Sequence, residues 1–341
     1  MTAMRAVRVD RPGEIGLVEL ERPRPGPGEA LMAVAAVGIC GSDVELLDGT
    51  RPAPYVRYPV VPGHEWAGTV AEIGPGVAGL APGDRVVAEG FRACERCDRC
   101  KEGRTNLCSA EYAETGFTHP GAFAEFVSVP ARLVHRLPAD ADLEAAALLE
   151  PAACVAQGLL EVDARPGLHA AVVGSGTIGL LAVAMLRLVS PARLTLVGSR
   201  AERLALGRRL GATEVVDVND DAAAGGLDGR FDLVFEAANR ASGGALALRL
   251  ARRGGTVVLE GISGSAEPSL TGDDVPLKHL RVQGVFGASG AAWRWVVSLF
   301  AAGLLDTRPL ISHRYGLGEF TQAFATLRDR QAGALKVQLT P

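Results

Sequence analysis

The 341-residue sequence lacks the features of a secreted, membrane-embedded or nucleic-acid-binding protein. Its first residues do not combine a basic region with a long apolar run, and its apolar segments, such as 180–186, are far shorter than the roughly 20 residues that cross a bilayer. The formal net charge is −4 and the charged residues are scattered, so the sequence shows no basic patch for nucleic acid. We therefore expect a cytoplasmic protein that acts on a small molecule and has neither a nucleic-acid nor a membrane partner.

The chain also lacks internal repeats and low-complexity tails, and its length exceeds the size at which one hydrophobic core stops growing. Hydrophobic residues make up 48% of it, which is enough to fill two cores. In the first part, turns rich in Gly and Pro separate short β-branched runs at 32–37, 69–73 and 85–88. This pattern predicts an antiparallel, β-rich domain that needs no long helix.

From about residue 142 the sequence alternates between apolar strands and amphipathic helices. An Ala- and Leu-rich segment at 143–160 contains Pro151, at which we expect a break. The alternation is typical of an α/β fold with a doubly wound parallel sheet. Strands are predicted at 170–173, 194–197, 214–216, 231–235, 256–259, 282–286 and 335–339, and helices at 177–188, 201–210, 242–251, around Trp293 and Trp295, and at 320–327.

The sequence has only six cysteines, and four of them fall within fifteen residues, which argues against a disulfide framework. The pattern Cys94-x2-Cys97-x2-Cys100-x7-Cys108 has the spacing of a zinc loop. Four thiolates complete a tetrahedral shell and leave no position for a substrate, so we predict a structural zinc. Incidental buried cysteines are the alternative, but these would not be interleaved with charged side chains.

Cys40, His64 and Glu65 form a second candidate metal site, within the segments Gly-Ile-Cys-Gly-Ser-Asp and Gly-His-Glu. One thiolate, one imidazole and one carboxylate give three protein ligands and leave the fourth position of a zinc ion free for water or an alcohol. This is the pattern of a catalytic zinc. Taken singly, each residue has an ordinary alternative, such as a loop histidine or a cysteine that packs as a small apolar residue.

A glycine fingerprint, Gly174-Ser175-Gly176-Thr177-Ile178-Gly179, lies directly between a predicted strand and a predicted helix. In such a turn the first glycine permits the tight bend, the second lets a pyrophosphate approach the backbone, and the third lets the helix pack on the strand. In so glycine-rich a chain the motif alone would be a weak signal. Its place at a strand-to-helix turn indicates a dinucleotide site.

With these three motifs, the chain resembles the zinc-containing medium-chain dehydrogenases/reductases, the alcohol/polyol dehydrogenase family, over essentially its whole length. The resemblance implies a GroES-like catalytic domain at 1–150 and 288–341, with the structural zinc lobe at about 91–110, and a Rossmann domain at 151–287. The active site would lie where the two domains meet. The resemblance also implies a homodimer or homotetramer that pairs its Rossmann sheets through the apolar segment 282–288.

The resemblance also implies roles for further residues near the zinc. Ser42 would carry the alcohol proton outward, and Asp43 would accept a hydrogen bond from the second ring nitrogen of His64, although an ordinary Ser-Asp turn is the alternative. Many relatives have a relay histidine where this chain has Glu45, which leaves that step to Glu45, a water chain or the cofactor ribose. Glu150 stands where polyol and sugar dehydrogenases have a glutamate, which would accept hydrogen bonds from vicinal hydroxyls. Its alternative is a solvated carboxylate at a helix end.

The end of the strand at 194–197 predicts a preference for NADP(H) over NAD(H). NAD-linked Rossmann domains place a carboxylate there, which binds the adenosine ribose and would repel a 2′-phosphate. Here the strand runs into Gly198, Ser199 and Arg200, with Arg203 one turn further on, similar to the Gly-Ser-Arg of NADP-linked family members. Gly198 would make room, the serine could donate to the phosphate, and the arginines could pair with its charge. The alternative is a solvated helix start whose arginines contact nothing.

The expected function is hydride transfer between NADP(H) and a secondary alcohol or ketone, with two zinc ions per chain. Zinc would lower the pKa of the alcohol, Ser42 would help to remove its proton, and hydride would pass to C4 of the nicotinamide. The expected substrate is a polyol, a sugar or an aminocyclitol. Two alternatives stay open: an amino-alcohol oxidation like that of L-threonine dehydrogenase, and a non-catalytic nucleotide-binding relative. Such non-catalytic proteins tend to lose zinc ligands, whereas this chain retains a complete set.

Overall fold

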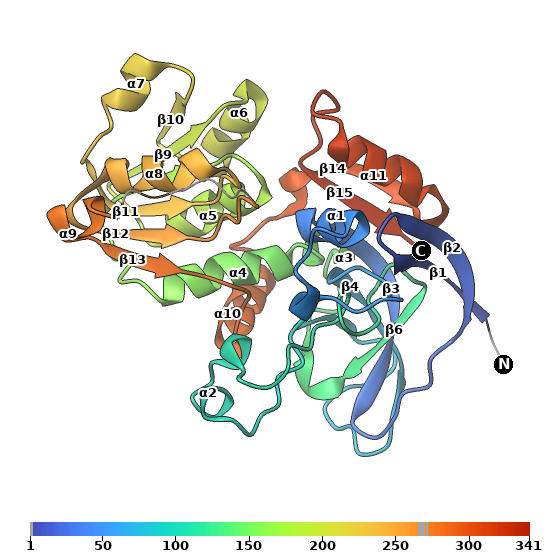
Figure 1. Cartoon of the computed structure of the whole chain (residues 1–341). Coiled ribbons are helices and arrows are strands. Elements are labelled where there is room, and N and C mark those ends of the chain that lie inside the picture. Colours follow the sequence, from blue (N-terminus) through green and yellow to red (C-terminus); the bar gives the residue numbers. More distant parts are fainter. Residues whose placement is uncertain (1–2, 265–269, 271) are drawn as a thin grey trace. The chain divides into compact units, whose positions relative to one another are not determined.

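The computed structural model describes residues 3–264, 270 and 272–341. The chain divides into two compact units, one formed by Met1–Glu150 together with Ala288–Pro341 and the other by Pro151–Gly287 (Figure 1). The first unit is therefore discontinuous in sequence, because its last segment returns to it after the second unit is complete.

The first unit is built on a sheet whose centre is β3. Within the described residues the strand order is β14-β15-β3-β4-β5-β7, with β6 also paired to β3, and β1 and β2 form a separate hairpin. Neighbouring strands are antiparallel except β14 and β15. The predicted β-rich domain is confirmed. The strands are β1 (Ala3–Arg11), β2 (Glu14–Glu21), β3 (Glu29–Ile39), β4 (Glu65–Ile73), β5 (Arg85–Ala88), β6 (Phe126–Pro130), β7 (Val134–Arg136), β14 (Ile311–Gly316) and β15 (Lys336–Thr340).

Short helices join these strands, and one of them, α1, was not expected from the β-rich sequence pattern. It begins after Cys40, whose backbone N–H donates to Oδ2 of Asp43 at 2.8 Å, and it ends at Gly49 in a left-handed conformation (φ 71°). The two ends of α1 are therefore determined by local capping rather than by apolar periodicity. The helices of the unit are α1 (Gly41–Asp48), α2 (Asp98–Lys101), α3 (Leu143–Ala146), α10 (Gly290–Ala301) and α11 (Phe320–Arg328), with 3-10 turns at Ala53–Tyr55, Thr105–Leu107, Ala131–Leu133, Arg308–Leu310 and Leu317–Glu319.

The core of the first unit includes residues from both of its sequence segments. Phe123 meets Phe324 of α11 edge to face, with ring centroids 6.2 Å apart. Trp293 of α10 is buried and stacks on His135 of β7, whereas Trp295 is half-buried. One of the two tryptophans therefore packs in the interior, as the two-residue spacing predicts for a helix.

The second unit is a parallel six-stranded sheet in the order β10-β9-β8-β11-β12-β13. The chain moves outward from β8 to β10 and in the opposite direction from β11 to β13, so the order reverses between β8 and β11. Sheets of this kind form a crevice at the carboxyl ends of the strands where the order reverses. The predicted Rossmann-like sheet is confirmed. Its strands are β8 (His169–Val173), β9 (Arg193–Gly198), β10 (Glu214–Asp217), β11 (Phe231–Glu236), β12 (Ala251–Leu259) and β13 (Arg281–Gly284), and its helices are α4 (Leu149–Leu160), α5 (Thr177–Arg187), α6 (Ala201–Leu210), α7 (Asp221–Gly225), α8 (Ala241–Leu250) and α9 (Asp274–Leu277).

The expected break at Pro151 is wrong, because α4 runs through this proline. Pro151 is the third residue of the helix, and the first N–H groups of a helix have no partner within it. The missing proline N–H therefore costs no helical hydrogen bond, and the fixed proline φ suits the first turn.

Phe235 of β11 is fully buried, and a side chain on Gly158 of α4 would begin 2.9 Å from its ring. We predict that Phe235→Ala lowers the free energy of unfolding by about 3–5 kcal/mol, because it removes a large apolar contact and leaves a cavity. Leu277→Ala, at a 68% exposed position of the same unit, is the control and should change the free energy of unfolding by less than about 0.5 kcal/mol. Denaturant unfolding measures both variants, and equal effects would contradict this core.

Candidate metal centres and dinucleotide site

Cys40, His64 and Glu65 come together because two neighbouring strands deliver them. Cys40 follows β3, Glu65 begins β4, and His64 precedes it directly. The two strands pair with Gly38 opposite Glu65. One potential ligand atom of each of the three residues lies within 4.8 Å of the other two. The sulfur, nitrogen and oxygen donors form a set that zinc accepts.

Asp43 faces His64 in the interior of this site. Its Oδ1 lies 3.6 Å from Nδ1 of His64, and neither atom has a hydrogen-bond partner within the described part of the chain. The expected hydrogen bond is therefore slightly too long, because the same carboxylate also caps α1 through the N–H of Cys40. The arrangement leaves Nε2 as the ring nitrogen for a metal. Burial lowers the pKa of His64, but Asp43, Cys40 and Glu150 together outweigh burial, and the pKa stands well above its usual value.

Two further carboxyl groups lie near His64: Glu114 is buried and Glu150 is half-buried. Desolvation raises the pKa of Glu150 to about 8 and that of Glu114 to about 7, although the charge of His64 acts to lower both pKa values. With Asp43 and Glu65, they give this region an excess of acidic groups. A divalent cation compensates such an excess, so the charge of the region as well as its donor atoms fits a metal ion.

Sequence analysis missed the two cations of this region, Lys336 and Arg51. Nζ of Lys336 lies 2.5 Å from Oε2 of Glu65. The guanidinium of Arg51 lies 3.7 Å from the centre of the Phe117 ring, which packs on His64 with ring centroids 4.7 Å apart. A lysine in a terminal strand and an arginine in a loop carry no sequence signal of burial, so only the tertiary structure identifies them.

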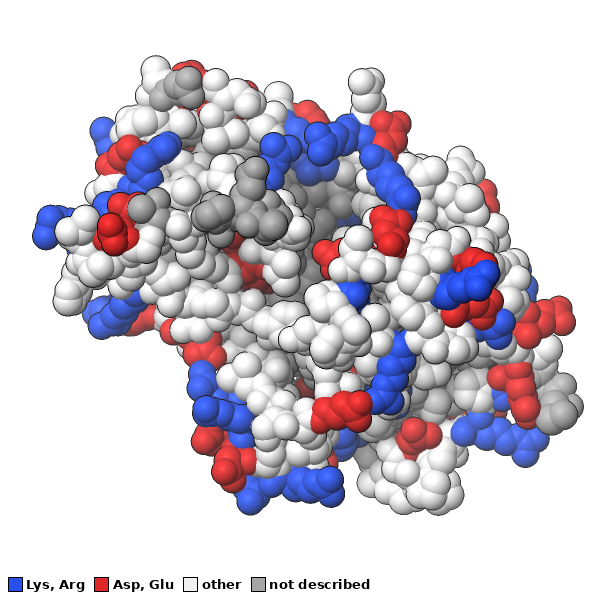
Figure 2. Space-filling model, viewed as in Figure 1, with Lys and Arg blue, Asp and Glu red and all other residues white. Residues whose placement is uncertain are grey.

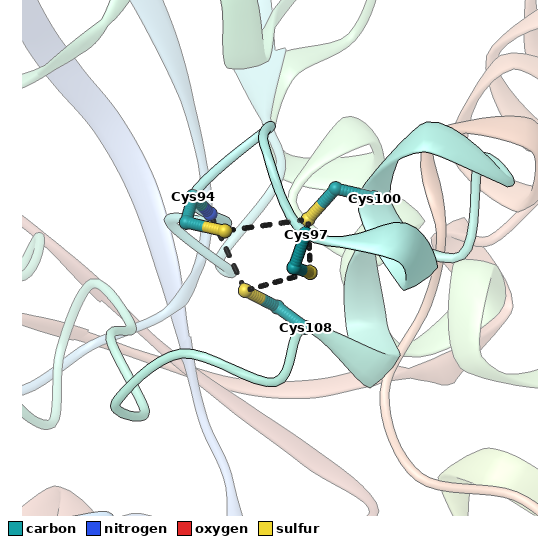
Figure 3. A group of neighbouring side chains, drawn as sticks. All are labelled: Cys94, Cys97, Cys100 and Cys108. Atoms are coloured by element: carbon teal, nitrogen blue, oxygen red, sulfur yellow. Dashed lines mark hydrogen bonds between the residues drawn. The ribbon is translucent and has the colours of Figure 1, made fainter.

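The four clustered cysteines converge on one loop of the first unit (Figure 3). Their sulfurs all lie within 4.8 Å of one another, and Cys97 is 3.5 Å from Cys100 and 4.0 Å from Cys108. Four sulfurs bound at about 2.3 Å to one zinc ion would be about 3.8 Å apart. The observed spacing therefore fits a tetrahedral site.

The ionisation of these thiols also fits a cation. Hydrogen bonds from Ser109 lower the pKa of Cys97 to about 5, whereas burial and the neighbouring Cys97 raise that of Cys100 to about 12. Four thiolates at this spacing thus need a positive charge among them. Cys154 of α4 belongs to neither ligand group among the described residues.

The carboxyl ends of β8, β9 and β11 surround a cavity of about 530 Å³ in the second unit. Gly174 turns the chain there with φ 109°, and a Cβ on Gly179 would lie 1.9 Å from the Gly174 carbonyl oxygen. A cavity of this size at the reversal of the strand order is suited to a dinucleotide. The predicted residues that line it are Gly174, Ser175, Gly176, Gly198, Ser199, Arg200 and Arg203, whereas Thr177, Ile178 and Gly179 begin α5 beside it.

Arg200 and Arg203 bring two positive charges to the wall of this cavity. Burial and the charge of Arg200 lower the pKa of Arg203, so an anion beside the two guanidinium groups would relieve their repulsion. Gly198 lines the same cavity, and a Cβ there would lie 2.5 Å from Oγ of Ser175, so a larger residue at this position would clash with that hydroxyl. Arg240, which precedes α8, lines the same cavity and was not predicted.

Positive and negative side chains are scattered among larger uncharged areas on the face shown in Figure 2, which is the distribution that the sequence predicts. Ion pairs in the described part of the chain include Arg5 with Glu125 at 2.9 Å and Arg193 with Glu214 at 2.5 Å. Across the described ranges, no helix has the length and apolar character of a membrane span.

Comparisons with known proteins point to one family. Residues 26–139 match the family model of the alcohol dehydrogenase GroES-like domain, and residues 177–302 match that of the zinc-binding dehydrogenases. An L-threonine 3-dehydrogenase of Deinococcus radiodurans is 34% identical, with 97% of this chain and 96% of that protein covered. A sorbitol dehydrogenase of Arabidopsis thaliana is 34% identical, with 92% and 89% covered. The crystal structure of a zinc-binding dehydrogenase of Sinorhizobium meliloti bound to NADP is 33% identical, with a TM-score of 0.93 and 100% of both chains covered.

Gly179→Ala would place a methyl group against the Gly174 carbonyl. We predict that NADPH binds at least about tenfold more weakly to this variant, because the turn must move away from the position of the phosphates. Gly225→Ala, at the end of α7 with no atom within 4 Å of the added carbon, is the matched control and should bind like the wild type. Fluorescence titration measures both, and unchanged binding by Gly179→Ala would place the dinucleotide elsewhere.

Proposed function

The chain belongs to the zinc-containing medium-chain alcohol dehydrogenase family, and from this premise we propose that it transfers hydride between NADP(H) and a secondary alcohol or ketone whose neighbouring carbon carries a polar group. Membership makes it a zinc-dependent oxidoreductase. The observation that carries the proposed substrate class is the carboxyl group of Glu150, which lies close enough to His64 to raise the pKa of the histidine.

Two zinc ions per chain follow from the two ligand sets. Cys94, Cys97, Cys100 and Cys108 would hold a structural zinc, and Cys40, His64 and Glu65 would hold the catalytic one. Zinc bound by the second set supplies Lewis acidity, which favours loss of the alcohol proton and polarises the ketone in the reverse direction.

The protein groups around this centre would orient the ligands and move the proton. Asp43 would fix the ring of His64 through their electrostatic contact. Ser42, half-buried in the first turn of α1, would take up the alcohol proton. From Ser42 the proton would leave through half-buried Glu45, a water chain or the cofactor ribose.

The dinucleotide would bind in the cavity of the second unit, with its pyrophosphate at the turn from Gly174 to Gly179 and at the start of α5. Ser199, Arg200 and Arg203 would bind the 2′-phosphate, and Arg240 adds a further positive charge to the same cavity. The NADP in the related Sinorhizobium meliloti structure supports this preference.

Glu150 favours substrates with a second hydrogen-bond donor next to the reacting carbon, because its carboxylate would accept from that group. A polyol, a sugar or an aminocyclitol is the first candidate. L-Threonine, which carries an amino group beside its hydroxyl, is the second, and it is favoured by the relative named L-threonine 3-dehydrogenase.

A second copy of the chain would pair along β13, which is an edge strand of the sheet within the described residues. Val282 and Phe286 are 36% and 40% exposed there, and covering them in a homodimer or homotetramer would bury apolar surface.

A substrate panel tests the proposed reaction. We expect NADP⁺-dependent oxidation of at least one polyol, sugar or aminocyclitol, with a kcat/KM at least about tenfold above that for a simple secondary alcohol such as 2-propanol. L-Threonine as the best substrate would select the second candidate. No turnover with any alcohol or ketone, in protein that contains zinc, would contradict the proposal.

Cys97→Ser tests the metal assignment. We expect the zinc content to fall from about two to about one per chain, and the melting temperature to fall, because a structural zinc contributes directly to folding. Cys154→Ser is the control and should retain both ions, since its sulfur lies in neither ligand group. Elemental analysis gives the zinc content of both variants, and an unchanged zinc content in Cys97→Ser would contradict the assignment of the four-cysteine site.

Arg200→Ala tests the cofactor assignment. We expect the KM for NADP⁺ to rise by about 10–100-fold, because a hydrogen bond to a charged phosphate contributes about 1.5–3 kcal/mol. The KM for NAD⁺ should change little. Arg208→Ala, at an exposed position of α6, the helix that follows Arg200, is the matched control and should change neither KM. A wild-type kcat/KM that is higher with NAD⁺ than with NADP⁺ would contradict the phosphate pocket.

A further inference from the structure

Lys336 and Glu65 form a buried ion pair beside the first set of metal ligands. Nζ of Lys336 lies 2.5 Å from Oε2 of Glu65, and the two side chains are 5% and 2% exposed. The same ammonium donates to the carbonyl of Ile39 at 3.3 Å. Ile39 immediately precedes Cys40, and Lys336 begins β15, which pairs with β3. The strand pairing therefore holds the ammonium next to the metal ligands.

The room for this ion pair exists because residue 38 is a glycine. A Cβ on Gly38 would lie 2.3 Å from Oε2 of Glu65 and 3.2 Å from Cδ of Lys336. Gly38 and Glu65 are direct partners in the register of β3 with β4. The carboxylate of Glu65 thus passes beside the bare Cα of Gly38, with Oε2 turned toward the lysine.

The residue type at this position is informative as well. Only three of the 35 basic residues of the chain are lysines, and of these Lys336 is the buried one. An ammonium is a compact charge that satisfies one carboxylate oxygen, whereas the planar fork of an arginine matches both.

We propose that Lys336 is a positioning residue, which ties Oε2 of Glu65 and leaves Oε1 as the single carboxylate oxygen for the metal that Cys40 and His64 also bind. This inference rests on the proposed function, in which these three residues hold the catalytic zinc. With one oxygen engaged, the carboxylate serves as a one-oxygen ligand and the fourth position stays free for substrate. Without the lysine, both oxygens can bind the metal and the free position is lost.

Cobalt(II) substitution tests this role, because the visible absorption of cobalt reports its coordination geometry. Lys336→Met should weaken and shift the bands of the first site and lower kcat by about 10–100-fold, with the Kd for NADPH unchanged. Lys336→Arg keeps the charge but offers a fork to both oxygens, so its cobalt should be removed faster by a chelator than that of the wild type. Cys40→Ser retains the four-cysteine site, so its spectrum is subtracted from that of every other variant to leave the bands of the first site.

Lys278→Met is the matched control. Nζ of Lys278 donates to the backbone carbonyls of Leu248 and Arg249 in the second unit, so this variant should keep the cobalt spectrum and kcat of the wild type.

A cobalt spectrum and a kcat of Lys336→Met that both match the wild type would overturn the positioning role. If Lys336→Met does not fold, Lys336→Arg decides: wild-type cobalt retention and kcat overturn the inference, and faster cobalt loss with an unchanged circular dichroism spectrum supports it. Equal cobalt binding by the wild type and Cys40→Ser is a separate failure, because it would remove the proposed catalytic centre itself.

Discussion

Strand β3 is the constraint on which the first unit depends, because it pairs with β4, β6 and β15. Its carboxyl end delivers Cys40, its register with β4 sets Glu65 beside Gly38, and its pairing with β15 brings Lys336 to the same place from the other end of the chain. A slip of one residue in either register would turn the partner side chain to the opposite face. Sheet register, rather than proximity in sequence, therefore assembles the candidate catalytic centre.

That centre gathers more buried carboxyl groups than lysine and arginine side chains. Asp43, Glu65, Glu114 and Glu150 meet Lys336 and Arg51 in a region where burial raises the pKa of two of the four carboxyl groups. Unpaired buried charge costs folding free energy, and a bound divalent cation removes that cost. Metal affinity and the stability of the first unit are therefore linked through the same side chains.

The sequence was most informative where chemistry or periodicity restricts residue type. The four-cysteine spacing and the Cys40, His64 and Glu65 set could be identified from ligand chemistry, and the six strands of the second unit from the repeated alternation of strands and helices. Pro151 was misread, because its effect depends on where α4 begins and not on its residue type. The burial of Lys336 could not be predicted, since a lysine in a terminal strand is ordinarily solvated and only the pairing of β15 with β3 encloses this one.

Ser175 and Gly198 constrain the order in which substitutions could change cofactor preference. The Ser175 hydroxyl occupies the space in which a side chain at position 198 would begin, so an acidic residue there clashes with it. If glycine replaces Ser175 first, the same acidic residue can enter without that clash, whereas alanine would keep the Cβ that lies 2.8 Å from the added carbon. The two positions are thus epistatic: one order of mutation passes through a strained intermediate and the other does not. A lineage of such proteins would be expected to change cofactor through position 175 before position 198.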